Sequence, residues 1–401
     1  MKTKLKDASF EKSALFMLIL SVTASAFNYL FQIISGRLLS AADYGVLNSA
    51  FSASNIITVM GVALGLSVAK NISENESNAG GKINLITKIC LLLFIPITAV
   101  IVVVFKLLNF DTQLSISAAI AVSLISMSYI FHGSMQGKCL FNNVSKFNLI
   151  QPFVKLLFGS CALLIGLKFH FVFIVMAIGS ICSIIYGYFV LNKTVSFKSK
   201  ATVGEISPIF KYYIFTFIST TLLTLFNNID ILLVRQYFSE NMVGIYSCAA
   251  LFGKIILYVP SVLCTMLFPL STKSSTNSKS VLAKTLLYSL LISGAAAVCL
   301  YILRDFLMTL VMGAEYSEAA NYILPITAVI IPLVLITVLV NYLIAREDKW
   351  FVTVSCALCA ALSILLTHFI HQSINSLLLT LAAVYCVLFI CLLIRSVSRN
   401  E

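Results

Sequence analysis

Apolar runs of membrane-spanning length recur along the whole chain. Each holds about 20 consecutive, mostly apolar residues, enough for an α-helix to cross the hydrocarbon core of a bilayer. Short polar segments separate the runs. The pattern predicts an all-α, multi-pass membrane protein of about twelve spans. We place the spans near residues 14–35, 46–69, 84–105, 113–132, 147–166, 170–191, 209–234, 245–270, 283–303, 321–344, 351–370 and 376–394.

A stripe of polar residues runs down the first of these spans. Its members are Ser21, Ser25, Asn28, Gln32 and Ser35. Their spacing of four, three, four and three places all five side chains on one face of an α-helix. Polar groups that face hydrocarbon find no hydrogen-bond partner there and cost free energy. We therefore expect this face to look onto other helices or a watery cavity.

The same stripe returns 199 residues later in the chain. Six pairs of positions match at this offset: Ser21 and Thr220, Ser25 and Thr224, Phe27 and Phe226, Asn28 and Asn227, Gly45 and Gly244, and Asn48 and Ser247. The match predicts two repeated six-helix bundles, over residues 1–192 and 209–401. A polar cytoplasmic linker is predicted over residues 193–208.

Composition excludes a soluble globular protein, since 60% of the residues are hydrophobic and only 10% are charged. The eleven cysteines lie almost wholly inside predicted spans, which argues against a disulfide framework. The four histidines show no spacing typical of metal ligands, so we expect no metal site.

The net charge of +12 is distributed unevenly about the predicted spans. Nineteen basic residues fall in the segments on the side of both termini, and five fall on the other side. Those five are Arg37, Lys106, Lys168, Arg235 and Arg304. The positive-inside rule then predicts that both termini are cytoplasmic. The basic excess is a topology signal and implies no nucleic-acid partner.

Ionisable residues inside spans are candidates for functional sites because they are costly in hydrocarbon. Asp230 lies in the seventh span, where it either carries a function or marks the helix end at the interface. Lys254 in the eighth span matches Asn55 at the 199-residue offset, which favours the interior. Lys155 and Lys88 either face a cavity or extend to the headgroups.

Two polar segments carry a resemblance to a known family. The turn GRLLSAADYG follows the first span, and MGAEYSEAA follows the ninth. With Arg37 and Asp43-Tyr44-Gly45 in one segment and Gly313 and Glu315-Tyr316 in the other, the chain resembles the polysaccharide repeat-unit flippases. These O-antigen and capsule transporters belong to the multidrug/oligosaccharidyl-lipid/polysaccharide (MOP) exporter superfamily.

The resemblance implies a V-shaped pair of six-helix bundles around a central cationic cavity in the bacterial cytoplasmic membrane. It implies a substrate that is an undecaprenyl-pyrophosphate-linked oligosaccharide, moved to the outer leaflet by alternating access. Polysaccharide polymerase and chain-length machinery would be partners, with no catalytic residue, cofactor or metal in this chain. Lys254 and Lys155 suit the pyrophosphate, and Asp230 would pair with Lys254 or carry a coupling proton. Side-chain amides suit the sugars, and the candidates are Asn28, Gln32, Asn55 and Asn227.

Three other functions remain as alternatives. A cation-coupled multidrug exporter of the same superfamily usually carries a buried acidic residue in its first half, and the first span has none. A lipid-linked peptidoglycan-precursor flippase usually has two further spans. A membrane glycosyltransferase or repeat-unit polymerase generally needs a large loop or an acidic cluster outside the bilayer, whereas Asp305, Glu315 and Glu318 are not clustered with Arg or His.

Overall fold

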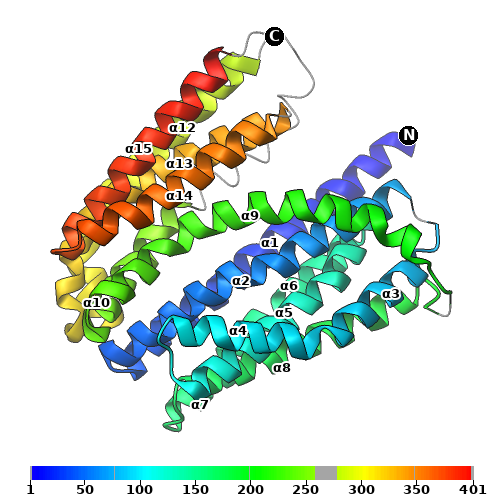
Figure 1. The fold of residues 1–401 in the computed structure, drawn as a ribbon, viewed down its shortest axis with the longest axis horizontal. Helices are drawn as coiled ribbons and strands as arrows, with labels where there is room; N and C mark the ends of the chain where they lie inside the picture. Colours follow the sequence, from blue (N-terminus) through cyan, green and yellow to red (C-terminus); the bar gives the residue numbers. More distant parts are fainter. Residues whose placement is uncertain (1, 76, 198, 258–277, 347, 399–401) are drawn as a thin grey trace. The chain divides into compact units, whose positions relative to one another are not determined.

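The computed structural model describes residues 2–75, 77–197, 199–257, 278–346 and 348–398. All regular secondary structure in these ranges is helical (Figure 1). Eleven of the described helices are long and apolar enough to cross a membrane, and a pair bent by 52° adds a twelfth. The predicted all-α, multi-pass architecture is confirmed. The part of the predicted span 245–270 after residue 257 lies outside the described residues.

The chain divides into two compact units. The first comprises Met1–Leu38 and Ala53–Thr221, and the second comprises Leu39–Ser52 and Leu222–Glu401. Two long helices, α2 (Ala41–Glu74) and α9 (Val203–Tyr237), contribute residues to both units. Because α9 begins at Val203, the last part of the segment predicted as a linker is helical.

In the first unit, α5 packs against α3, α4, α6 and α8, and α1 packs against α6 (Figure 1). Where α2 crosses α5, glycines bring the two backbones together, since a Cβ on Gly133 would overlap the Gly65 carbonyl oxygen. The helices of this unit besides α2 and α9 are α1 (Lys2–Leu38), α3 (Ala79–Leu92), α4 (Phe94–Leu107), α5 (Thr112–Gly137), α6 (Phe141–Val154), η1 (Lys155–Gly159), α7 (Ser160–Leu164) and α8 (His170–Asn192).

The segment between α8 and α9 is docked onto the first turns of α3. The Asn78 amide donates to the Lys200 carbonyl oxygen at 2.9 Å and to Glu205 Oε1 at 3.0 Å. Beyond this point, Ile206 and Ile209 of α9 are buried in the same apolar core as Ile83 of α3. The start of α9 is thereby fixed in the first unit.

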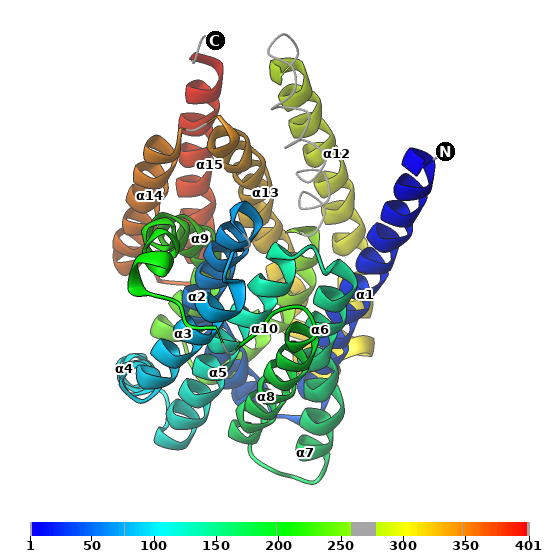
Figure 2. The same cartoon turned by 90° about the vertical axis from the view of Figure 1, so that its right-hand side faces the viewer.

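In the second unit, α13 packs against α12, α14 and α15 (Figure 2). Its side chains Val338 and Leu339 are fully buried there. The helices of this unit besides α2 and α9 are α10 (Glu240–Gly253), η2 (Lys254–Leu257), α12 (Ser278–Asp305), η3 (Phe306–Met312), η4 (Ala314–Tyr322), α13 (Ile323–Ala345), α14 (Lys349–Phe369) and α15 (Ile374–Ser398).

The 199-residue repeat is visible in the helix boundaries. Helix α1 ends at Leu38 and α9 ends at Tyr237, while α2 begins at Ala41 and α10 begins at Glu240. The repeated polar stripe therefore belongs to structurally equivalent helices.

Candidate functional site

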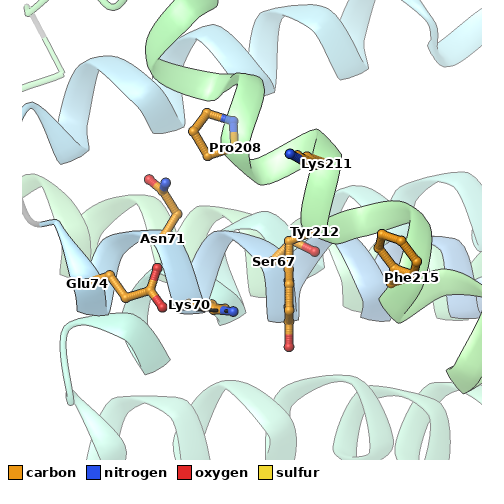
Figure 3. Close-up of a pocket in the computed structure, with 8 residues that line it drawn as sticks. All are labelled: Ser67, Lys70, Asn71, Glu74, Pro208, Lys211, Tyr212 and Phe215. Atoms are coloured by element: carbon orange, nitrogen blue, oxygen red, sulfur yellow. Dashed lines mark ion pairs between the residues drawn. The ribbon is translucent and has the colours of Figure 1, made fainter. Parts of the chain in front are cut away.

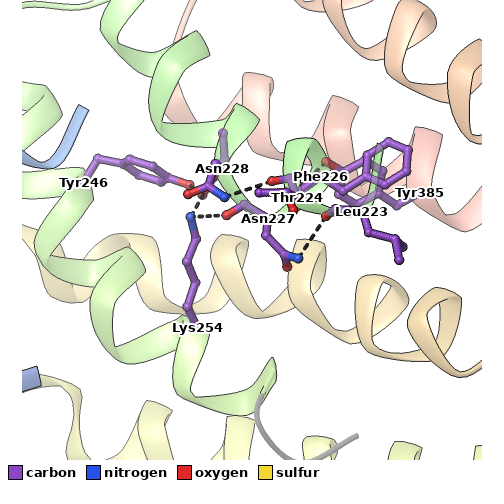
Figure 4. Close-up of polar contacts among 9 residues, drawn as sticks. Leu223, Thr224, Phe226, Asn227, Asn228, Tyr246, Lys254 and Tyr385 are labelled. Atoms are coloured by element: carbon purple, nitrogen blue, oxygen red, sulfur yellow. Dashed lines mark hydrogen bonds and ion pairs between the residues drawn. The ribbon is translucent and has the colours of Figure 1, made fainter. Parts of the chain in front are cut away.

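The second unit contains a buried ion pair between membrane-spanning helices. The ammonium Nζ of Lys254 lies 2.9 Å from Asp230 Oδ1 and donates to the Asn227 carbonyl oxygen at 2.8 Å (Figure 4). The other carboxylate oxygen of Asp230 accepts a 2.7 Å hydrogen bond from the Tyr246 hydroxyl. Both oxygens of the buried carboxylate are thus satisfied.

Helix periodicity explains how two elements present this site. Asn227 and Asp230 are three residues apart on α9, which places them on one face. Tyr246 and Lys254 are eight residues apart, about two turns along one face of the α10–η2 segment. The α-helix gives way to a 3-10 turn at Lys254 itself. These four residues come together because one face of α9 packs against one face of the α10–η2 segment.

The surroundings leave the lysine more accessible than its partner. The Lys254 side chain is 20% exposed, whereas that of Asp230 is 9% exposed. Behind them, the Tyr385 hydroxyl donates to the Phe226 carbonyl oxygen at 3.3 Å, and the two rings meet edge to face (Figure 4). The Asn227 amide nitrogen bonds to the Leu223 carbonyl of its own helix at 2.9 Å. Asn227 thus accepts from the lysine through its backbone carbonyl, while its side-chain nitrogen donates within its own helix.

Lys155 occupies an unusual backbone position in the first unit. Proline 152 lacks the N–H that would continue the α6 hydrogen bonds, and a π-helical turn follows from Lys155 to Gly159. Lys155 is only 9% exposed, and its Nζ lies 5.1 Å from the centre of the Phe31 ring of α1. This distance permits a cation–π interaction. The side chain of Lys88, in contrast, is exposed.

The burial of the polar stripe on α1 changes along the helix. Asn28 and Gln32 are partly buried, and Ser35 is fully buried. The Asn28 amide bonds to the Ala24 carbonyl of its own helix at 3.2 Å. Gln32 Oε1 is buried and accepts no hydrogen bond within the part of the chain that the structure describes. Asn55, on α2, is exposed.

The structure thus brings Lys254, Asp230 and Asn227 together in the second unit. In the first unit, Asn28 and Gln32 lie on α1, which packs against the turn that carries Lys155. No sequence pattern singles out Tyr246, the hydrogen-bond donor to Asp230. One tyrosine among 16 in an apolar chain gives no periodic signal, and its role emerges only from the packing of α10 against α9.

The two motifs that carry the family resemblance meet within the second unit. Glu315 Oε1 accepts a 3.0 Å hydrogen bond from the Ala41 backbone nitrogen, the first residue of α2. Beside it, the buried rings of Tyr44 and Tyr316 meet edge to face with centroids 5.7 Å apart. A carboxylate at this position satisfies a backbone donor and complements the positive end of the helix dipole. The motifs therefore form one structural contact.

Solved structures of MOP-superfamily transporters share this fold. A structure of the lipid II flippase MurJ in an inward closed conformation aligns with a TM-score of 0.79 and 12% identity, over 96% of this chain and 88% of that one. A multidrug resistance MATE family transporter of the MOP superfamily, inward-facing, aligns at 0.75 and 10% identity, over 94% and 96%. A MOP superfamily transporter from Pyrococcus furiosus aligns at 0.67 and 12% identity, over 96% and 95%.

Beyond the shared fold, the sequence itself identifies the family. Residues 34–321 match the family described as polysaccharide biosynthesis protein, and the chain belongs to that family. No curated protein matches the chain significantly. The family match and the shared fold confirm the resemblance that the motifs around Tyr44 and Tyr316 indicated.

Proposed function

We propose that this protein is a flippase of the bacterial cytoplasmic membrane. It moves undecaprenyl-pyrophosphate-linked oligosaccharide repeat units from the inner to the outer leaflet for assembly of O-antigen, capsule or exopolysaccharide. Membership of a polysaccharide biosynthesis family and the MOP transporter fold support the proposal. The observation that carries it is the Lys254 ammonium, held between membrane-spanning helices and still partly exposed.

The geometry around Lys254 suits reversible capture of a pyrophosphate. An ammonium has three donors, and two are used by Asp230 and the Asn227 carbonyl. The third is left for a ligand oxygen. A pyrophosphate oxygen that accepts from this third donor leaves the contact with Asp230 in place, and the Tyr246 hydroxyl continues to hold the carboxylate. Both charges of the pair keep their partners, which avoids the high cost of an uncompensated charge between the helices.

The remaining candidates have subsidiary roles in the proposal. Lys155 supplies a second cation, and Gln32 supplies a buried acceptor for a sugar hydroxyl. The side-chain amides of Asn28, Asn55 and Asn227 are further sugar contacts. Two repeated bundles are the architecture expected for alternating access. Polysaccharide polymerase and chain-length machinery would use the product on the outer side.

The decisive experiment follows the substrate in cells. The gene is deleted, and the leaflet that holds the lipid-linked oligosaccharide is determined together with the amount of surface polysaccharide. We expect cytoplasmic accumulation, relieved by wild type but not by Lys254→Ala. Lys284→Ala, at an exposed lysine of α12, is the matched control and should restore export. Normal surface polysaccharide with altered sensitivity to toxic cations would instead identify a drug exporter.

A further inference from the structure

A second polar site lies in the first unit, where the end of α2 meets the start of α9. It is a pocket of about 350 Å³. Ser67, Lys70, Asn71 and Glu74 of α2 line one side, and Pro208, Lys211, Tyr212 and Phe215 of α9 line the other (Figure 3). The topology prediction places this end of both helices at the cytoplasmic surface of the membrane. None of these residues belongs to the site around Lys254.

The charges of the pocket leave one cation uncompensated. Lys70 Nζ lies 3.8 Å from Glu74 Oε1 and 4.0 Å from the centre of the Tyr212 ring, so its charge is shared with a carboxylate (Figure 3). Lys211, on the opposite wall, makes no ion pair with any acidic residue that the structure describes. The pocket therefore suits a ligand that carries a single negative charge.

The pocket also contains an unused hydrogen-bond acceptor. Asn71 Oδ1 is buried, and no donor reaches it from the residues that the structure describes. Buried polar atoms normally have a partner, and one without a partner calls for a specific explanation. A ligand hydroxyl would supply the missing donor, and the Glu74 carboxylate is available on the same wall to accept a second one.

An apolar stripe leads away from the pocket along α9. Ile214, Phe215 and Ile218 follow Lys211 along one face of the helix and are 57%, 53% and 41% exposed. Phe215 also lines the pocket itself. On a membrane-spanning helix such a stripe contacts acyl chains. A ligand that occupies both features has a polar head with an apolar tail.

We propose that this pocket binds the headgroup of an anionic glycerophospholipid of the phosphatidylglycerol type. The phosphodiester, with one negative charge, lies against Lys211 and Lys70. The glycerol hydroxyls donate to Asn71 and Glu74, and an acyl chain follows the stripe of Ile214, Phe215 and Ile218. A diphosphate diester carries two negative charges, one more than the net charge of Lys70, Lys211 and Glu74 balances. The bound lipid would join the end of α2 to the start of α9.

Lipid binding to the purified full-length protein tests the proposal. Native mass spectrometry measures retention of phosphatidylglycerol, phosphatidylcholine and polyprenyl pyrophosphate by wild type, Lys211→Gln and Lys146→Gln. Lys146 is an exposed lysine of α6 outside the pocket, so its variant matches the change in charge. We expect wild type to prefer phosphatidylglycerol, and Lys211→Gln to weaken that binding about fivefold. Lys146→Gln should bind like wild type.

Two results would overturn the proposal. One is equal binding of phosphatidylglycerol by Lys211→Gln and Lys146→Gln. The other is a wild-type preference for polyprenyl pyrophosphate or phosphatidylcholine at the site that Lys211→Gln weakens. Lys254→Ala should retain phosphatidylglycerol fully, because Lys254 belongs to a different site. The lipid pocket and the proposed transport function can therefore fail independently.

Discussion

Gly45 and Gly244 pack backbone against backbone at the N-terminal ends of α2 and α10. A Cβ built on Gly45 would lie 2.6 Å from the Gly244 nitrogen and 3.0 Å from its Cα. The two glycines occupy the same position in the 199-residue repeat. The equivalent first turns of α2 and α10 therefore meet each other directly within the second unit.

This close approach predicts that Gly244→Ala is destabilising. The new Cβ would overlap the Ala41 carbonyl oxygen, and a backbone atom cannot move aside as a flexible side chain does. We expect a loss of ~1–3 kcal/mol in the free energy of unfolding, as for other overpacked sites. Thermal unfolding in detergent measures it. Gly294→Ala in α12, where the described residues leave open space around the Cβ, should instead stabilise by ~0.5–1 kcal/mol. Equal effects of the two variants would contradict this explanation.

The sequence was sufficient to predict the architecture because its signals are periodic. Apolar runs gave the spans, and the spacing from Ser21 to Ser35 gave the polar stripe, which is partly to fully buried from Ser25 onward. The repeat offset also relates helix boundaries that the apolar pattern alone does not define, such as those at Leu38 and Tyr237. The hydrophobic period and the repeat offset can both be read from the sequence, so neither requires knowledge of how the helices pack.

The site was predictable only in part, because its contacts depend on how the helices pack against each other. The cost of charge in hydrocarbon singled out Asp230 and Lys254, but their 2.9 Å separation depends on how α9 and the α10–η2 segment are rotated. The same holds for Lys155, since sequence allowed either a buried or a headgroup position, and Phe31 and the π-helical turn settle its burial. The contribution of Glu315 to α2 joins residues 274 positions apart. No local pattern encodes such contacts.

The ion pair predicts strongly coupled effects of mutation. Lys254→Met alone leaves the Asp230 carboxylate buried without its cation, which typically costs about 3–5 kcal/mol. Combining it with Asp230→Asn removes both charges and should recover most of that loss. A double-mutant cycle on thermal unfolding measures the coupling. Simple addition of the two single effects would show that the pair contributes nothing to stability.

A coupling role for Asp230 needs a separate experiment. Transport by Asp230→Asn is measured under an imposed proton gradient and compared with wild type. If Asp230 carries the coupling proton, the variant loses its response to the gradient, because an amide does not titrate. Unchanged coupling assigns Asp230 to the ion pair alone, the role that its contacts with Lys254 and Tyr246 already provide.

Tyr246→Phe tests the hydroxyl that holds the Asp230 carboxylate. Removing this 2.7 Å hydrogen bond leaves one carboxylate oxygen without its donor, and bonds to charged groups contribute about 1.5–3 kcal/mol. We expect lower thermal stability and slower transport. Tyr385→Phe is the matched control, because the Tyr385 hydroxyl donates to the uncharged Phe226 carbonyl at the longer distance of 3.3 Å. Its smaller effect, about 0.5–1.5 kcal/mol, should leave transport nearly intact. A larger effect of Tyr385→Phe would argue against a special role for Tyr246.

The contact between Glu315 and the start of α2 joins two motifs that lie far apart in the sequence. Glu315→Ala removes the acceptor for the Ala41 N–H and the negative charge at the helix N-terminus. Loss of a helix cap costs about 0.5–2 kcal/mol, so thermal stability should fall by that amount. Glu315→Gln keeps an oxygen acceptor and should be milder. Glu318→Ala, at an exposed carboxylate on the same short helix η4, should be neutral. Hydrogen exchange at the first turn of α2 should rise only in the Glu315 variants, and an equal rise in Glu318→Ala would assign the effect to η4 itself.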